Sequence, residues 1–306
     1  MADSRDSAPK MHEHQIDVSE QDVLRLISTQ FPQWTGEPVA RIPSYGTTNA
    51  MFTLGADKVV RLPFIPGDGA GVAVETALLE RVSGELPVAI PEVIATGRAD
   101  ECYPFTWNVL GWVPGEMPVP EALADASGLI DDLIAVLVRL RELPTEGVRV
   151  AQRGGSLAPL ADLVHETMRE LDGEFDTEVL RALWDDALAA PGWQGDPVWV
   201  HSDLLPSNLL VDERGRLAGV LDWAAAGVGD PSCELLAAWN VFPDDARELF
   251  RARLEDRLQL DDAMWRRGRG WAVSQAVLAL PYYRNTNAGM AEMATRALRA
   301  LARESV

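Results

Sequence analysis

The spacing of apolar residues divides the chain into a strand-like first part and a helical second part. Before residue 115, short apolar runs bounded by turn residues are typical of strands. One helical interval, Val72–Val82, interrupts them, with apolar residues three and four positions apart. Ser19 and Asp22 begin an earlier helical pattern, which should end before Pro32, and their spacing is that of a helix cap. The predicted strands are Val39–Ile42, Ala50–Leu54, Val59–Leu62 and Phe105–Val113.

Longer amphipathic patterns dominate after residue 115. The clearest helix is predicted over Ala126–Leu143, where leucine and isoleucine recur at helical spacing. Sheet first and helix later is the order of an α+β fold with two unlike lobes. We expect a disordered leader over residues 1–14, an N-terminal lobe over 15–113 and a C-terminal lobe over 114–306. The other predicted elements are helices at Leu157–Leu171 and Thr177–Ala190 and strands at Val198–Val200, Leu209–Val211 and Ala218–Leu221.

Composition and charge narrow the class of protein. Of the 306 residues 47% are apolar, which suffices for a sizeable core and excludes general disorder. The chain has 27 basic and 47 acidic residues, a net charge of −20. Nucleic acids and anionic membranes are therefore disfavoured partners, and cationic partners are favoured. Solubility alone is the other reading of this acidity.

The opening residues and the cysteines bear on location. The first ten residues are polar and lack the apolar stretch of a secretory signal, and no apolar run reaches the roughly 18 residues of a membrane span. Cys102 and Cys233 match no zinc or disulfide spacing, as expected in a reducing compartment. We therefore expect a cytoplasmic protein, either a monomer or a homodimer.

One loop collects the residues best suited to chemistry. The segment V-W-V-H-S-D-L-L-P-S-N-L-L-V-D holds His201, Asp203 and Asn208 between two apolar strands, and Asp222 ends another strand further on. Phosphoryl transfer requires a carboxylate at the attacking hydroxyl and oxygen ligands for Mg²⁺. Asp203 suits the first task, and Asn208 and Asp222 the second. His201 would hold the loop by hydrogen bonds.

A purely structural interpretation of these residues is possible one by one. Asp203 could cap a turn, Asn208 could close a turn after Pro206, and Asp222 could cap a helix. The flanking strands and the second acid at a suitable distance favour the chemical interpretation.

The loop and the later aspartate resemble the signature of the aminoglycoside phosphotransferase-like kinases, relatives of the protein kinases. That family's loop commonly reads H-G-D-x-H-P-x-N, and this chain has Ser202 and Leu205 where glycine and histidine are usual. The resemblance implies a protein-kinase-like fold of two lobes, a small one with an antiparallel sheet and a mostly helical one. It also implies a small-molecule kinase that uses ATP or GTP with Mg²⁺.

The same resemblance extends into the first lobe. P-S-Y-G-T-T-N-A, residues 43–50, is similar to the loop that covers nucleotide phosphates, although it lacks a full G-x-G-x-x-G; alone, it would read as a plain hairpin loop. Backbone N–H groups and hydroxyls there can approach phosphate oxygens. The nucleotide-binding residues expected in this loop are Ser44, Gly46, Thr47, Thr48 and Asn49.

A cation should face the α- and β-phosphates from the strand that follows. Arg61 takes the place where protein kinases carry lysine, with Lys58 as the alternative. Strand alternation does not put both side chains on one face, so only one can serve. Glu75, on the next helix, is the expected partner of Arg61, and a solvated surface glutamate is the plain alternative.

By the same resemblance, the hinge between the lobes lines the adenine or guanine base through Val109, Leu110, Gly111 and Trp112. Four later residues are candidates for the acceptor side: Asp230, Glu234, Trp271 and Tyr282. Asp230 also suits a helix N-cap before Pro231 or a support for the catalytic loop, and the aromatic residues also suit a core.

Three functions fit these features. The leading hypothesis is O-phosphorylation of a cationic, aminoglycoside-like antibiotic, which would confer resistance. The first alternative is the same chemistry on a macrolide, a nucleoside or a metabolite. The second is a nucleotide-binding module without catalysis, against which the presence of Asp203, Asn208 and Asp222 argues.

Overall fold

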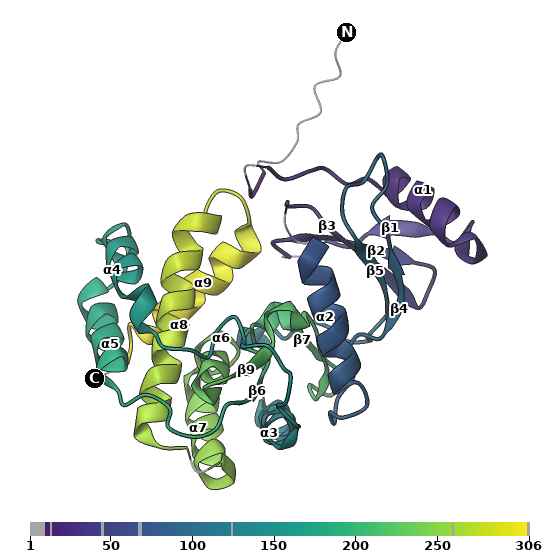
Figure 1. The fold of residues 1–306 in the computed structure, drawn as a ribbon. Helices are drawn as coiled ribbons and strands as arrows, with labels where there is room; N and C mark the ends of the chain where they lie inside the picture. The colour runs from purple at the N-terminus through teal and green to yellow at the C-terminus, as the bar shows by residue number, and fades with distance from the viewer. Residues whose placement is uncertain are drawn as a thin grey trace.

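A computed structural model describes residues 10–12, 14–43, 46–66, 69–123, 125–258 and 260–304. It has a small sheet-containing lobe and a larger, mostly helical lobe (Figure 1). This confirms the predicted α+β fold with two unlike lobes. Within the described ranges, no helix combines the length and the apolarity that crossing a membrane requires.

The first lobe contains a five-stranded sheet in the order β1-β2-β3-β5-β4, in which all neighbours are antiparallel. β3 is buried along its whole length because it lies between β2 and β5, whereas β2 alternates between buried and half-buried residues. Gly55 turns the chain between β2 and β3 at φ +65°, a conformation that favours glycine. The strands are β1 (Val39–Arg41), β2 (Asn49–Leu54), β3 (Lys58–Pro63), β4 (Val93–Gly97) and β5 (Trp107–Gly111).

Two helices accompany this sheet. α1 (Glu20–Gln30) begins at Ser19, whose side chain forms the predicted capping box with Asp22. Its apolar face packs with Phe52, Trp107 and neighbouring strand residues in one core. α2 (Gly69–Val82) lies between the sheet and the helical lobe (Figure 1).

The second lobe is built around α8, against which α5 and α9 pack most extensively. Two short antiparallel strand pairs, β6 with β9 and β7 with β8, flank the segment that holds the predicted catalytic residues. The helices are α3 (Ser127–Glu142), α4 (Ala161–Arg169), α5 (Thr177–Ala189), α6 (Ala237–Asn240), α7 (Asp244–Leu258), α8 (Asp262–Tyr283) and α9 (Ala288–Leu301). The strands are β6 (Val198–Val200), β7 (Leu209–Val211), β8 (Leu217–Val220) and β9 (Gly227–Gly229).

Most of the predicted elements are present, with small shifts at their ends. The helix predicted at Leu157–Leu171 is instead a short 3₁₀ turn followed by α4, which ends at Arg169. β4 and β9 were not predicted, because β4 is a half-exposed strand and β9 is a three-residue G-V-G segment. The apolar run of β4 is only three residues long, and β9 has a single apolar side chain.

Part of the segment expected as a leader makes defined contacts. The Nδ1 atom of His12 lies 2.7 Å from the hydroxyl of Tyr282 at the end of α8, and Nε2 contacts the carbonyl of Thr47. The Ile16 N–H donates to the Phe64 carbonyl at 2.8 Å. Residues 10–12 therefore contact both lobes, and residues 1–9 and 13 lie outside the described part.

Candidate active site

The loop between β6 and β7 holds His201, Asp203 and Asn208. His201 is buried and its Nε2 lies 2.9 Å from the Leu221 carbonyl, while its Nδ1 lies 3.3 Å from the Asp203 N–H. Burial lowers the pKa of His201, so the neutral ring can donate at one nitrogen and accept at the other. These contacts suit the loop-holding task predicted for His201.

Glu234 supports the same loop from below. It lies in the 3₁₀ helix that follows β9, and its two carboxylate oxygens accept from the backbone N–H groups of His201 and Ser202. Burial raises the pKa of Glu234 to about 7, against the opposing effect of these two N–H groups. Ser202 adopts φ +64°, so the loop turns in a conformation that a non-glycine residue rarely takes and that these contacts help to hold.

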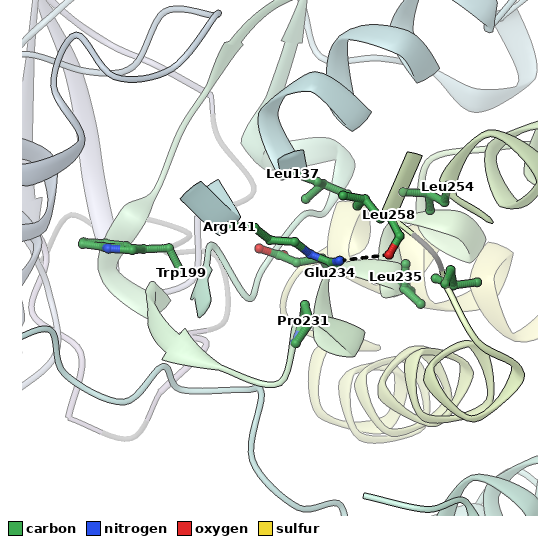
Figure 2. A pocket seen from close by; sticks show the side chains of 9 residues that line it. Leu137, Arg141, Trp199, Pro231, Glu234, Leu235, Leu254 and Leu258 are labelled. Atoms are coloured by element: carbon green, nitrogen blue, oxygen red, sulfur yellow. Dashed lines mark hydrogen bonds between the residues drawn. The ribbon is translucent and has the colours of Figure 1, made fainter. Parts of the chain in front are cut away.

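A small cavity is lined in part by Glu234. Figure 2 shows Arg141 and Glu234 among apolar residues of neighbouring helices, with Arg141 donating to the Leu258 carbonyl at 3.4 Å. The cavity volume is about 10 Å³, which is room for about one water molecule. It therefore has no space for an acceptor.

Asp203 is held at both carboxylate oxygens. Oδ1 accepts from Arg153 Nη1 at 2.7 Å, and Oδ2 accepts from Asn208 Nδ2 at 3.0 Å. The side chain is 21% exposed, so the carboxylate is neither sealed inside the protein nor freely solvated. Sequence reasoning missed Arg153, which lies 50 positions upstream outside any recognised motif.

Asn208 and Asp222 are joined through the backbone of Leu221. The Leu221 N–H donates to the Asn208 carbonyl at 2.8 Å, and the Leu221 carbonyl lies within hydrogen-bond distance of His201 Nε2. Asn208 donates through Nδ2 to Asp203, and its Oδ1 accepts no hydrogen bond from the part of the chain that the structure describes. Asp222 sits at φ +57° with its side chain 42% exposed. Two oxygen donors, Asn208 Oδ1 within the loop and the Asp222 carboxylate after β8, thus lie on segments that the Leu221 backbone joins.

Arg61 connects Asp222 to the first lobe. Its guanidinium pairs with Glu75 of α2 and donates to Asp222 Oδ1 at 3.0 Å, and the Trp223 N–H donates to Glu75 at 3.1 Å. Burial opposes ionisation of Asp222, but the charge of Arg61 and its hydrogen bond outweigh it and hold the pKa of Asp222 below its usual range. The predicted pairing of Arg61 with Glu75 is present.

Lys58 points to a different part of the first lobe. Its Nζ lies 2.6 Å from Asp57 and 3.1 Å from Glu37, above the ring of Trp34. Arg61 and Lys58 are the two cations considered for phosphate binding. Within the described part of the chain, only Arg61 contacts Asp222.

The expected phosphate loop is partly described. Ser44 lies outside the described residues, whereas Gly46, Thr47, Thr48 and Asn49 lie within them. With its amide oriented to satisfy its neighbours, Asn49 accepts from Arg61 Nη2 at 3.0 Å and Nε at 3.1 Å. This end of the loop is therefore next to the cation expected to bind phosphates.

The hinge segment runs along β5 and leaves it at Gly111. Val109 and Leu110 are buried and pair with both β3 and β4. The N–H groups of Gly111 and Trp112 already bond to the Glu92 and Asp57 carbonyls, each at 2.8 Å. A nucleotide base would have to meet other backbone groups of this segment.

Three of the four acceptor candidates are buried and have internal tasks. Asp230 caps the 3₁₀ helix through the Ser232 N–H at 2.9 Å and pairs with Arg267 at 2.7 Å. Glu234 holds the catalytic loop, and Trp271 is only 5% exposed within α8. The acceptor role expected for these three stays a prediction, and their burial argues against it. Tyr282 is 53% exposed and stays a candidate.

Comparisons with known proteins agree with this geometry. A sequence model described as the phosphotransferase enzyme family matches residues 39–271. Among curated proteins, the uncharacterized protein YcbJ of Bacillus subtilis (strain 168) is 38% identical over 50 residues, which are 16% of each chain.

Solved structures resemble the whole fold. The GDP and kanamycin complex of APH(2")-IIia has a TM-score of 0.71 at 20% identity, covering 91% of this chain and 96% of that one. The macrolide 2'-phosphotransferase MphH from Brachybacterium faecium, an apoenzyme, has a TM-score of 0.57 at 24% identity, covering 90% and 97%. The ADP-bound aminoglycoside phosphotransferase APH(2'')-Ib has a TM-score of 0.60 at 17% identity, covering 92% and 98%.

Proposed function

Since the chain belongs to the phosphotransferase enzyme family, we propose that it transfers the γ-phosphate of a nucleotide to a hydroxyl of a small molecule. The observation that carries this proposal is the position of Asp203. Its carboxylate is held between Arg153 and Asn208. The backbone of Leu221 joins this loop to Asp222, which pairs with Arg61 of the first lobe. An aspartate held in this way beside two further oxygen donors is what phosphoryl transfer requires.

The reaction follows from this arrangement. The acceptor hydroxyl oxygen forms a bond to the γ-phosphorus while its proton passes to the Asp203 carboxylate. The bond from that phosphorus to the β,γ-bridging oxygen breaks, and the nucleoside diphosphate leaves. Asp203 orients the hydroxyl and takes the proton, and the rest of the site keeps the reacting groups in line. His201 acts indirectly, by holding the loop.

Arg61 and the loop residues Gly46, Thr47, Thr48 and Asn49 would bind the phosphates. A fixed guanidinium is suited to phosphate oxygens, and Glu75 keeps it in place. The hinge residues Val109, Leu110, Gly111 and Trp112 would line the base. ATP and GTP both remain candidates, because the structural neighbours include GDP and ADP complexes.

The residues present also fit Mg²⁺. Asn208 Oδ1 and the half-exposed Asp222 carboxylate are hard oxygen donors, and this cation commonly takes only one or two protein ligands together with substrate phosphates. No cluster of three or more histidine, cysteine or acidic residues that could hold a metal occurs among the described residues. When bound, Mg²⁺ would neutralise phosphate charge.

The acceptor is the least constrained part of the proposal. We propose an aminoglycoside-like antibiotic first and a macrolide second, because both classes of phosphotransferase share this fold and the chain is strongly acidic. Antibiotic resistance in the cytoplasm would be the biological outcome. Asp230 and Glu234, the two carboxylates expected to bind a cationic acceptor, are buried. Their burial favours the macrolide alternative.

The proposal is tested by incubating the protein with Mg²⁺, ATP or GTP, and a panel of aminoglycosides, macrolides, nucleosides and sugars. Mass spectrometry should find one added phosphate on at least one class. Nucleotide binding without any phosphorylated compound across a broad panel would instead support the nucleotide-binding module.

A further inference from the structure

We propose that Arg153 is a positioning residue for phosphoryl transfer, which fixes the Asp203 carboxylate in the orientation that meets the acceptor hydroxyl. This inference rests on the proposed function and adds to it a residue from outside the catalytic loop. Its basis is the contact of Arg153 with both the side chain and the backbone of that loop.

The segment that carries Arg153 is held firmly beside β9. Backbone bonds join the Val228 N–H to the Arg149 carbonyl at 2.8 Å and the Ala151 N–H to the Val228 carbonyl at 3.0 Å. A further bond joins the Asp230 N–H to the Gly154 carbonyl at 2.6 Å. The segment therefore behaves as an added strand, and Arg153 projects from an ordered backbone.

Glycines make this close approach possible. A Cβ atom on Gly227 would lie 2.6 Å from backbone atoms of Arg149 and Ala151, and one on Gly229 would lie 2.7 Å from the Gly154 carbonyl oxygen. Gly154 itself adopts φ +99° immediately after Arg153. The G-V-G sequence of β9, which has few side chains to pack, thus admits the segment that delivers the arginine.

Arg153 joins the carboxylate to the loop backbone. One nitrogen, Nη1, donates to Asp203 Oδ1 at 2.7 Å and to the Ser202 carbonyl at 3.0 Å. Asn208 donates to the other carboxylate oxygen. Each oxygen keeps a second lone pair, so a hydroxyl can still bind while both neighbours hold the carboxylate plane. Leu205, in the same loop, is buried and offers no polar group for this purpose.

The position of Arg153 separates this role from a merely structural one. Its side chain is 25% exposed, and partly exposed ion pairs of this kind contribute little to stability. Misplacement of a reacting group by about 1 Å, in contrast, can cost about 10²-fold in rate. Loss of Arg153 should therefore affect turnover far more than folding.

The test compares Arg153→Gln and Arg153→Lys with the matched control Arg149→Gln. Arg149 lies on the same segment, and among the described residues its side chain donates only to the carbonyls of Val150 and Ala224. We expect Arg153→Gln to lower kcat about 10- to 100-fold with the nucleotide KM within about threefold of wild type. Arg153→Lys should lower kcat less than Arg153→Gln does, and Arg149→Gln should have the wild-type kcat. Guanidinium ions should partly restore kcat to Arg153→Ala, whereas sodium at equal ionic strength should not.

Several outcomes would overturn the role of Arg153. These are an unchanged kcat in Arg153→Gln, an equal fall in Arg149→Gln, or no rescue by guanidinium. If Arg153→Gln does not fold, Arg153→Lys decides, because wild-type kcat there contradicts the proposal and a several-fold lower kcat supports it. The hydrolysis of nucleotide by water, without acceptor, is measured in parallel, and its rate should rank the variants in the same order as kcat does. Absence of both transfer and hydrolysis in wild type overturns the proposed function and this role together, whereas wild-type turnover that persists in Arg153→Gln overturns this role alone.

Discussion

The residues proposed to bind the nucleotide and the residue proposed to meet the acceptor are held in different ways. On the nucleotide side, Arg61 is fixed by partners from three segments, namely Glu75, Asp222 and Asn49. On the acceptor side, the exposed candidate Tyr282 is held by one bond to His12 of the N-terminal segment. The cation proposed to bind the phosphates thus has more fixed partners than the one residue that stays a candidate for the acceptor. The predictions below test this contrast.

The largest effect should come from breaking the buried pair of the nucleotide side. Arg61→Met leaves Glu75 buried without its counter-charge, which should lower the free energy of unfolding by about 3–5 kcal/mol. Lys58→Met is the matched control and should cost less, because its partners Asp57 and Glu37 are 79% and 29% exposed, whereas Glu75 is buried. Urea denaturation measures both, and an equal loss in the two variants would contradict the assignment of Arg61.

The second effect concerns the metal. Asp222→Asn should weaken nucleotide binding about 10- to 100-fold when Mg²⁺ is present and change it little when Mg²⁺ is absent, because the variant loses a carboxylate ligand. Calorimetric titration with a nucleotide gives both affinities. The exposed Asp212→Asn, on the turn between β7 and β8, serves as the control. Equal binding with and without Mg²⁺ in wild type would count against the metal assignment.

The third effect is a pH dependence of stability. Because the pKa of Glu234 is raised from 4.5 to about 7 in the folded protein, its contribution to stability is present below about pH 4.5 and is lost as the pH rises through about 7. Glu234→Gln cannot titrate, so the stability advantage of wild type over this variant should shrink by about 2 kcal/mol between pH 5 and pH 8. Denaturation curves at several pH values, with exposed Glu80→Gln as the control, measure the slope. An advantage that grows with pH would contradict the direction of the shift.

The smallest effect is expected on the acceptor side. Tyr282→Phe removes one hydrogen bond to His12, worth about 1 kcal/mol, and should raise the acceptor KM a few-fold while the nucleotide KM stays unchanged. His12→Ala removes the same bond from the other end together with the contact of His12 with the Thr47 carbonyl, so the nucleotide KM is compared in Tyr282→Phe alone. Similar shifts in both variants would assign the effect to this contact, and a larger shift in the nucleotide KM than in the acceptor KM would reverse the proposed division of the cleft.

The same contrast explains what the sequence could predict. The spacing of His201, Asp203, Asn208 and Asp222 reflects short loops between strands, so it predicts their proximity directly. The partner of Arg61 followed from the next helix. Arg153 lies 50 positions upstream of Asp203 and reaches it only because its segment packs beside β9. No local sequence pattern predicts such a contact.

The acceptor residues were harder to predict for a related reason. Asp230 and Glu234 are acidic and close to the motif in sequence, which made them suitable ligands for a cation. Their environment decides otherwise, since Arg267 and the loop N–H groups bind them in the interior. Residue type and spacing can indicate chemistry, but the side to which a carboxylate points depends on tertiary packing.

The most direct test of the central claim is transfer of a labelled γ-phosphate by wild type and by Asp203→Asn, a variant of nearly the same shape. With an acceptor found in the panel, wild type should give the phosphorylated product, and Asp203→Asn should be slower by about 10²- to 10⁴-fold with its nucleotide affinity nearly unchanged. Equal rates in the two proteins would contradict the role of Asp203 and with it the account of this site.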